Sequence, residues 1–377
     1  MITAPPVIPV PGIRVVVAGG HSAGHIEPTM NFADALKRLE PSAEVTALGT
    51  VRGLDTTLIP QRGYPLELIP PVPFHRKINK AFFQIPGNLR RSIQAAGDVL
   101  ERTRAEAIVG FGGYVALPGY LAARRRGLPI VVHEANARPG VANKIAARFT
   151  EFVFTASPSV VLPHAVPIGI PLRPAIASLD RAALRAEARQ HFGLPAGGPV
   201  LMVTGGSQGA QAINTAVAAA APALRAAGIA VLHITGPQNT VDVEDSPGYR
   251  VVKYVNQMQY AYAAADFVIC RSGAMTVAEL SAVGLPAAYV PLPLRGGEQR
   301  FNAVPVVQAG GAIVVDDADL SAAWIEAELI PRLRDPVTVQ RMAAAASQAG
   351  ARDADVVLAR YVLSIVEERR RFGRGKK

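Results

Sequence analysis

Hydrophobic residues along the chain gather in short continuous runs, and between these runs they recur at helical spacing. Continuous apolar runs are typical of strands that are buried on both faces of a parallel sheet, with helices as the crossovers. In the first half of the chain this pattern predicts a helix over 28–39 and strands over 13–18, 44–48, 107–109, 130–133 and 152–155.

The same alternation restarts after a polar, proline-containing connection over 171–199. In the second half it predicts helices over 210–227 and 276–283 and strands over 200–204, 230–235, 267–270 and 287–290. We therefore expect an α/β protein with two Rossmann-like, doubly wound parallel-sheet domains that face a central cleft, where strand ends and loops converge.

The composition agrees with two folded domains. A chain of 377 residues, of which 50% are hydrophobic and 18% charged, is long enough for two cores and too apolar for wholesale disorder. The most apolar stretch, 216–232, is interrupted by Pro222 and Arg225, so we expect no membrane-spanning helix. Residues 1–12 are rich in proline and lack a cation, unlike a secretory signal.

Cysteine usage and charge narrow the function classes. Cys270 is the only cysteine, which excludes a disulfide framework and a cysteine-rich zinc site and fits a reducing, cytoplasmic setting. The net charge of +10 divides into +7 for residues 1–172, −1 for 173–366 and +4 for 367–377. A basic excess indicates an anionic partner, which the charge count alone leaves open among nucleic acid, lipid headgroups and phosphorylated substrates.

Three glycine-rich turns, 19–25, 110–114 and 205–209, each follow a predicted strand. Glycine allows positive φ and close approach of a ligand, and free N–H groups at a following helix start attract phosphate. A tight strand-to-helix turn also needs glycine for steric reasons, so a single loop is weak evidence. None of the three matches the dinucleotide or P-loop fingerprint, which argues against a dehydrogenase or a nucleoside triphosphatase.

Polar residues at predicted strand ends supply the candidate chemistry. His25 has two interpretations. It is a general base, because the ordinary pKa of histidine is near neutral pH, or it is a residue that only hydrogen-bonds to its own loop. The clusters 133–136 and 297–302 are interpreted either as residues that line a cleft or as turn caps and surface residues. Glu279 lies one turn into a predicted helix. It is interpreted either as the residue that binds a ribose through its hydroxyls or as a carboxylate that complements the helix dipole. The D-x-D pairs 317–319 and 353–355 are interpreted as caps and solvated faces, and no metal site is assigned.

Taken together, the motifs closely resemble those of the MurG family of glycosyltransferases (family 28), which transfer N-acetylglucosamine from UDP-GlcNAc to lipid I and so make lipid II in peptidoglycan biosynthesis. The matching segments follow the family's order and span most of residues 13–303: 19–28, 110–118, 133–144, 205–214, 271–279 and 297–303. The resemblance implies the GT-B architecture. It assigns 1–172 to an acceptor- and membrane-side domain and 173–354 to a UDP-sugar domain, with a helix over about 355–377 returning to the first.

Individual roles follow from the same resemblance. It places Ser22, Ala23, Gly24 and Asn136 near the donor sugar, and Arg173 at the domain junction. The remaining donor contacts are Ser207 on the diphosphate, Val255 at the uracil, and Ala274, Met275, Thr276, Val277, Ala278 and Glu279 around diphosphate and ribose. Glu298 and Gln299 lie near the sugar. Glu298 and Ala135 replace the glutamines usual in the family, which puts individual sugar contacts in question.

The implied reaction is an inverting displacement without a metal or other cofactor. The C4 hydroxyl of the N-acetylmuramoyl acceptor attacks the anomeric carbon, UDP leaves, and a β-1,4 bond forms. Backbone N–H groups and helix N-termini would stabilise the leaving group. His25 is the predicted base, with Glu134 and Tyr114 as supporting acceptor-side groups.

The resemblance also suggests a role for the excess of basic residues in the first half of the chain. Segment 74–83 interleaves cations with apolar and aromatic residues and continues through Ile85, Leu89, Arg90 and Arg91. This is similar to the family's membrane-facing patch, and its alternative is an ordinary amphipathic helix. We expect UDP-GlcNAc, lipid I and an anionic membrane surface as partners, no nucleic acid, and a peripheral location at the cytoplasmic face of the membrane.

Two rival functions remain open at this point. Another GT-B enzyme, such as a UDP-sugar-dependent glycolipid synthase or a UDP-GlcNAc epimerase, would share the donor-side motifs, whereas 110–118 and 133–144 favour the lipid I enzyme. A basic nucleic-acid-binding protein would explain the charge, but aromatic residues make up only 6% of the chain and no nucleic-acid motif is recognisable.

Overall fold

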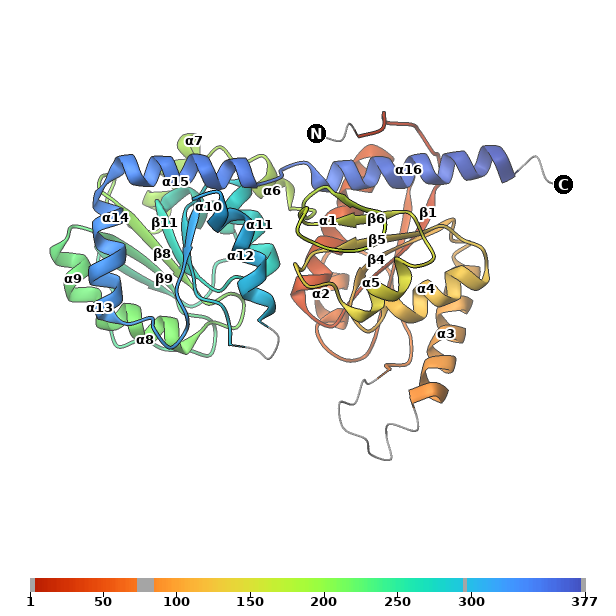
Figure 1. Ribbon diagram of the computed structural model, residues 1–377, viewed down its shortest axis with the longest axis horizontal. Helices are drawn as coiled ribbons and strands as arrows, with labels where there is room; N and C mark the ends of the chain where they lie inside the picture. Colours follow the sequence, from red (N-terminus) through yellow and green to blue (C-terminus); the bar gives the residue numbers. More distant parts are fainter. Residues whose placement is uncertain (1–3, 73–84, 294–296, 374–377) are drawn as a thin grey trace. The chain divides into compact units, whose positions relative to one another are not determined.

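The structure is a computed structural model and describes residues 4–72, 85–293 and 297–373 (Figure 1). The chain divides into two compact units, one formed by Met1–Leu172 with Asp353–Lys377 and the other by Arg173–Arg352. Each unit is a parallel sheet covered by helices on both faces. The expected α/β class with two doubly wound parallel sheets is therefore confirmed.

The first unit contains a seven-stranded sheet of order β3-β2-β1-β4-β5-β6-β7. Its strands are β1 (Arg14–Gly19), β2 (Glu44–Gly49), β3 (Leu66–Leu68), β4 (Ala107–Gly112), β5 (Ile130–Glu134), β6 (Val153–Thr155) and β7 (Ala165–Pro167). Its helices are α1 (Ala23–Leu39), α2 (Asp55–Gln61), α3 (Ile85–Arg102), α4 (Ala116–Arg125), α5 (Val141–Ala146) and α16 (Ala354–Gly373).

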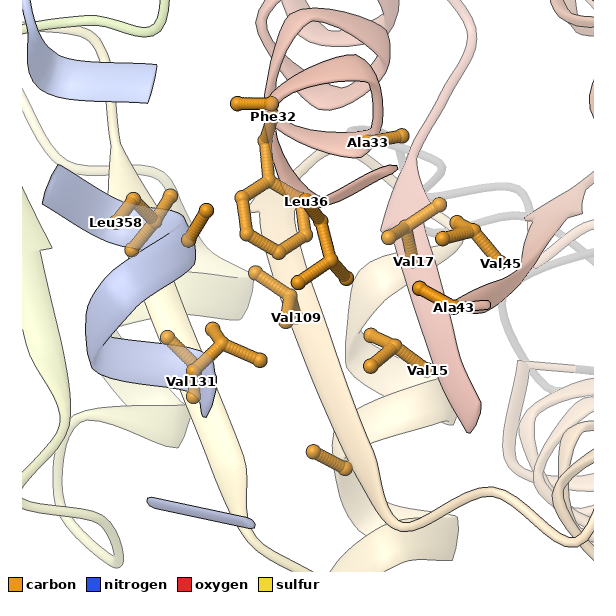
Figure 2. Close-up of a cluster of buried hydrophobic side chains, with 14 of the residues drawn as sticks. Val15, Val17, Phe32, Ala33, Leu36, Ala43, Val45, Val109, Val131 and Leu358 are labelled. Carbon is orange, nitrogen blue, oxygen red and sulfur yellow. The ribbon is translucent and has the colours of Figure 1, made fainter. Parts of the chain in front are cut away.

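Both faces of this sheet are buried, which explains the continuous apolar runs. Along β1, Val15 and Val17 belong to the core cluster under α1 and α16, whereas Val16 and Ala18 belong to the cluster on the opposite face. Figure 2 shows the first cluster, with side chains of α1 and Leu358 of α16 packed over the strands. A strand with one solvated face would have shown alternating polar positions instead.

Helix α16 packs along α1 and is attached by ion pairs near both of its ends. Asp355 Oδ2 lies 2.5 Å from Arg38 Nη2 of α1. Near the other end, Arg370 donates two hydrogen bonds of 2.7 Å to the two carboxylate oxygens of Glu106. Helix α16 is thus part of the first unit's core.

The second unit contains a six-stranded sheet of order β10-β9-β8-β11-β12-β13. Its strands are β8 (Val200–Thr204), β9 (Ala230–Ile234), β10 (Tyr249–Val252), β11 (Phe267–Cys270), β12 (Ala287–Tyr289) and β13 (Ala312–Val314). Its helical segments are α6 (Pro174–Ala177), α7 (Arg181–His191), α8 (Gln211–Ala219), α9 (Ala221–Ala226), α10 (Met258–Ala264), α11 (Ala274–Ala282), α12 (Glu298–Gln308), α13 (Ala322–Trp324), η2 (Ile325–Leu329), α14 (Ile330–Arg334) and α15 (Pro336–Ala349).

Three details of the predicted elements are wrong. Helix α1 begins at Ala23, so Pro28 lies inside it and does not mark its start. The helix predicted over 210–227 is two helices, because Pro222 occupies the first turn of α9. The connection 171–199 contains α7, whose N-cap Asp180 accepts hydrogen bonds from two first-turn N–H groups.

Among the described residues, no helix is long and apolar enough to cross a membrane.

Candidate functional site

In the first unit, the predicted site residues lie at the carboxyl ends of β1, β4 and β5. Because the strands are parallel, these ends share one edge of the sheet. Ser22 and His25 follow β1, Tyr114 follows β4, and Glu134 and Asn136 end and follow β5. The structure therefore brings the predicted acceptor-side residues His25, Tyr114 and Glu134 to one edge. Ser22 and Asn136, which were predicted near the donor sugar, lie at the same edge.

Ser22 and His25 are joined at the start of α1. Ser22 is the N-cap residue, but its side chain makes no capping bond and lies instead with Oγ 3.1 Å from His25 Nδ1. Gly112 lies beside the other ring nitrogen, where a Cβ would be 3.4 Å from His25 Nε2, and its φ of 89° is a conformation that glycine adopts readily. Burial, and next the neighbouring His21, lower the pKa of His25, while Asp55 acts in the opposite direction. The imidazole is therefore neutral at neutral pH and able to accept a proton.

The glycine loop after β1 is held by Asp55, a residue that the sequence analysis missed. Asp55 is 1% exposed and accepts hydrogen bonds from the N–H groups of His21 (2.5 Å) and Thr50 (2.8 Å). His21 has φ of 78°, a backbone conformation that is unfavourable for residues other than glycine. Asp55 thus stabilises a strained loop next to His25. Only its place shortly after the strand β2 hinted at such a role.

Glu134 is a buried carboxylate that orders the loop after β5. It accepts hydrogen bonds from the N–H groups of Asn136 and Gly140 and from the side-chain amide of Asn143, each 2.9 Å. Burial raises its pKa, and these donors oppose the shift. Asn143 also accepts from the Tyr120 hydroxyl at 2.8 Å, so the network reaches α4. The carboxylate thus fixes the position of Asn136, and Asn143 is a second residue that the prediction missed.

Tyr114 is 48% exposed and lies edge-on to His21, with ring centroids 5.6 Å apart. His133, which directly precedes Glu134 in the motif 133–144, is a core residue. It is fully buried, its Nε2 lies 2.8 Å from the carbonyl oxygen of Gly169, and burial lowers its pKa to about 4.

In the second unit, the glycine loop 205–209 follows β8 and precedes α8. Thr204 Oγ1 accepts from the N–H of Gly206, and Asn239 donates to the carbonyl oxygen of Gln208 at 3.0 Å. Gly209, with φ of 76°, packs so closely on Thr235 that a Cβ would lie 2.2 Å from its carbonyl oxygen. Ser207 is exposed at the tip of this ordered loop.

The segment 274–279 forms the first turns of α11, directly after β11. Gly273 is its N-cap residue and has no side chain to occupy the first N–H groups, and no acidic residue lies in the first turn. This helix start is suited to an anion. Glu279 lies further along and is 7% exposed, with its Oε1 3.5 Å from Arg173 Nη2 and its Oε2 2.6 Å from the Tyr262 hydroxyl. Tyr262 is the third residue that the prediction missed.

The remaining predicted donor contacts also follow strands of the second sheet. Val255 is half-buried in the loop between β10 and α10. Glu298 and Gln299 open α12, and Gln299 Oε1 accepts from the N–H of Leu292 at 2.9 Å.

The acidic D-x-D pairs take part in structural ion pairs. Asp317 pairs with Arg271 and Asp355 with Arg38. The described part of the chain has no group of three or more His, Cys, Asp or Glu side chains that could hold a metal ion.

Comparisons with known proteins agree with this architecture. The model of the glycosyltransferase family 28 N-terminal domain matches residues 15–155, and that of the family 28 C-terminal domain matches residues 200–358. A crystal structure of MurG from Acinetobacter baumannii has a TM-score of 0.75 at 25% identity and covers 95% of this chain and 100% of that chain.

Curated relatives are similar over nearly the whole chain. A protein of Streptomyces avermitilis is 56% identical over 363 residues, which are 95% of this chain and all of that protein. A protein of Mycolicibacterium smegmatis is 54% identical over 369 residues, or 96% of each chain. Both are named UDP-N-acetylglucosamine–N-acetylmuramyl-(pentapeptide) pyrophosphoryl-undecaprenol N-acetylglucosamine transferase. With both domain models matched in order across two GT-B-type sheets, the chain belongs to glycosyltransferase family 28.

Proposed function

We propose that this chain transfers N-acetylglucosamine from UDP-GlcNAc to the C4 hydroxyl of the N-acetylmuramoyl sugar of lipid I, which yields lipid II and UDP. One observation carries the proposal: the 56% identity over the full length of a relative that is named for this transfer. The two sheets support it, because each presents a glycine loop and a helix start at its carboxyl edge.

The second unit is proposed to bind the donor nucleotide. Backbone N–H groups of the loop 205–209, the Ser207 hydroxyl and the start of α11 would hold the diphosphate, and Arg173 supplies a nearby cation. Glu279 would accept the ribose hydroxyls, and the backbone around Val255 would contact the uracil. Charge that develops on the departing diphosphate is stabilised by these fixed donors and helix ends, which need no rearrangement during the reaction.

The first unit is proposed to activate the acceptor. For His25 Nε2 to act as a base, its proton must sit on Nδ1, and Nδ1–H then donates to Ser22 Oγ at 3.1 Å. In this tautomer Nε2 takes the proton of the C4 hydroxyl while the oxygen attacks the anomeric carbon from the face opposite UDP. The C1–O bond to UDP breaks with its electron pair, so the configuration inverts and a β-1,4 bond forms.

We further propose that the enzyme works at the cytoplasmic face of a membrane as a peripheral protein. Of the predicted basic patch, 74–83 lies outside the described residues, but Arg90 and Arg91 are exposed on α3 and Leu89 is half-buried. Salt-sensitive sedimentation with anionic vesicles is the expected result. Equal binding to neutral vesicles would contradict an electrostatic contribution.

The transfer itself is tested with radiolabelled UDP-GlcNAc and a lipid I analogue, with unlabelled UDP-GalNAc as the competing donor. We expect label in the lipid product and little competition by UDP-GalNAc. Conversion of the donor to its 2-epimer without transfer would indicate the epimerase alternative, and transfer to a diacylglycerol would indicate a glycolipid synthase.

A further inference from the structure

Tyr262 of α10 and Glu279 of α11 share a buried hydrogen bond in the second unit. The phenol O–H donates to Glu279 Oε2 over 2.6 Å, and the two residues are only 2% and 7% exposed. A hydrogen bond to a carboxylate at this length is charge-assisted and stronger than one between neutral groups. The contact is therefore a fixed feature of the unit and not a surface pairing that water can replace.

The phenol keeps its proton and acts as the donor. Burial, followed by the adjacent charge of Glu279, raises the pKa of Tyr262 well above its ordinary value. At neutral pH, Tyr262 therefore presents an O–H to the carboxylate.

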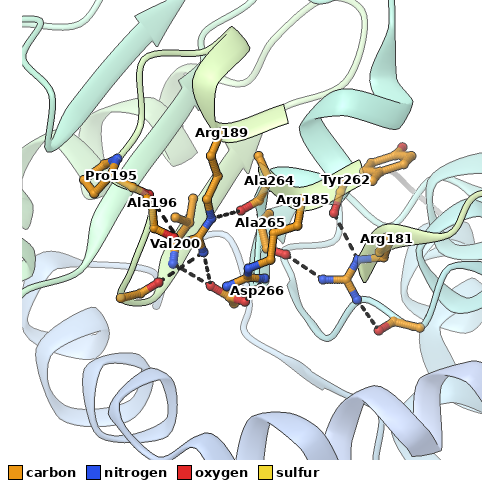
Figure 3. Close-up of polar contacts among 12 residues, drawn as sticks. Arg181, Arg185, Arg189, Pro195, Ala196, Val200, Tyr262, Ala264, Ala265 and Asp266 are labelled. Carbon is orange, nitrogen blue, oxygen red and sulfur yellow. Dashed lines mark hydrogen bonds and ion pairs between the residues drawn. The ribbon is translucent and has the colours of Figure 1, made fainter. Parts of the chain in front are cut away.

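The backbone of Tyr262 is itself held in place, as Figure 3 shows. The guanidinium of Arg181 donates to the carbonyl oxygens of Tyr262 (3.0 Å), Ala265 (2.6 Å) and Gly284 (2.8 Å). Gly284 follows α11, so one side chain joins the end of α10 to the end of the helix that carries Glu279. The phenol thus reaches Glu279 from a rigid support.

We propose that Tyr262 is a positioning residue for the donor nucleotide, which holds the Glu279 carboxylate in the orientation that accepts the ribose hydroxyls. The proposal rests on the ribose role given to Glu279 above. The terminal torsion of a glutamate is broad, so a carboxylate that is held at Oε1, by Arg173 at 3.5 Å, but lacks the bond at Oε2 still samples several orientations. Fixing one oxygen beforehand removes part of the ordering cost that the nucleotide would otherwise meet on binding.

The test compares UDP with 2′,3′-dideoxyuridine diphosphate, which lacks the two ribose hydroxyls, by titration calorimetry on the full chain. Tyr262→Phe keeps the ring and removes the O–H. We expect it to weaken UDP binding by about 5- to 20-fold. This is less than the roughly 10- to 150-fold that corresponds to a whole hydrogen bond to a charged group, because the lost bond is to Glu279 and not to the nucleotide itself. Binding of the dideoxy nucleotide should change by less than about two-fold, because its affinity includes no contact of ribose hydroxyls with Glu279. In turnover, KM for UDP-GlcNAc should rise while kcat changes little.

Tyr249→Phe is the matched control, because it removes an equally buried phenol that pairs with His233 at 2.8 Å. It should leave the ratio of the two affinities unchanged. An equal loss for both nucleotides in Tyr262→Phe, or no loss for UDP, would overturn the positioning role.

Glu279→Ala, which removes both carboxylate oxygens, separates this proposal from the assignment on which it rests. It should abolish the preference for UDP over the dideoxy nucleotide. If the preference survives, Glu279 is not the ribose ligand and the role of Tyr262 fails with it, although GlcNAc transfer itself stays supported. If Glu279→Ala loses the preference while Tyr262→Phe keeps it, only the role of Tyr262 is rejected.

Discussion

Ser22 Oγ lies 3.1 Å from His25 Nδ1 at the first turn of α1, so the residue at the N-cap position orients the imidazole and does not cap the helix with its side chain. A serine in this place usually caps the N–H groups of its helix. Here the Ser22 hydroxyl occupies none of those groups and contacts the imidazole instead. In the tautomer with the proton on Nδ1, that proton is donated to Ser22 Oγ and Nε2 is the basic nitrogen.

His25→Ala should reduce kcat by about 100- to 10,000-fold, the usual contribution of a general base. The Kd for UDP should stay within about two-fold, because the nucleotide contacts are proposed for the second unit. Steady-state turnover and calorimetry measure the two quantities. His164→Ala, an exposed histidine of the same unit, is the control and should behave like the unaltered enzyme. Unchanged turnover in His25→Ala would remove the residue from the role of base.

The pH profile of kcat/KM, which reports the free enzyme, should place the acidic limb below the ordinary histidine value of 6.5, since burial lowers the pKa of His25. Protonation removes the lone pair of Nε2, so activity should fall as the pH falls through that lowered pKa. An acidic limb above pH 6.5 would contradict the lowering of the His25 pKa by burial.

Two other histidines should make the fold sensitive to acid. Burial lowers the pKa of His133 and His233 to about 4, below the unfolded value of 6.5. Their neutral forms stabilise the folded state fully above pH 6.5, and this contribution is lost as the pH falls towards 4. Between these limits each histidine lowers the free energy of unfolding by about 1.4 kcal/mol per pH unit. Urea titrations at pH 7 and pH 5 measure the difference, and a stability independent of pH over this interval would contradict it.

Asp55→Asn should lower the free energy of unfolding by about 1–3 kcal/mol, because an amide cannot accept from both His21 and Thr50 N–H groups. The loop after β1 then loses its support, so kcat should fall while UDP affinity is retained. Denaturation and kinetics on the same preparation test both effects. Asp98→Asn on α3, where the amide oxygen can still accept the hydrogen bond that Gln94 donates, should alter neither.

Much of the fold could be predicted because both faces of the central strands are buried. In β1, β4 and β8 every position or nearly every position is apolar, and such continuous runs can be recognised in the sequence. The edge strands β3 and β7 were not predicted, since three residues such as Leu66-Glu67-Leu68 carry too little pattern. The start of α1 was placed late because Pro28 resembles a first-turn proline, although it lies in the helix.

The site was predictable where its residues follow strand ends and not where distant contacts support them. Glycine loops, His25 and Glu279 are recognisable from short motifs. Asp55 meets His21 across 34 positions of sequence, and Tyr262 meets Glu279 across 17. Such partners become neighbours only through the sheet order and the packing of α10 near α11, so no local pattern identifies them. For Glu134 the structure adds the loop-ordering bonds to Gly140 and Asn143, which the motif does not reveal.

The most direct test of the proposed function is the structure of the product formed from UDP-GlcNAc and a soluble lipid I analogue, determined by NMR. We predict one N-acetylglucosamine joined β-1,4 to the N-acetylmuramoyl sugar, with one UDP released for each bond formed. An α-linked product, a bond to another hydroxyl, or release of UDP with free N-acetylglucosamine and no new bond would contradict inverting transfer to lipid I.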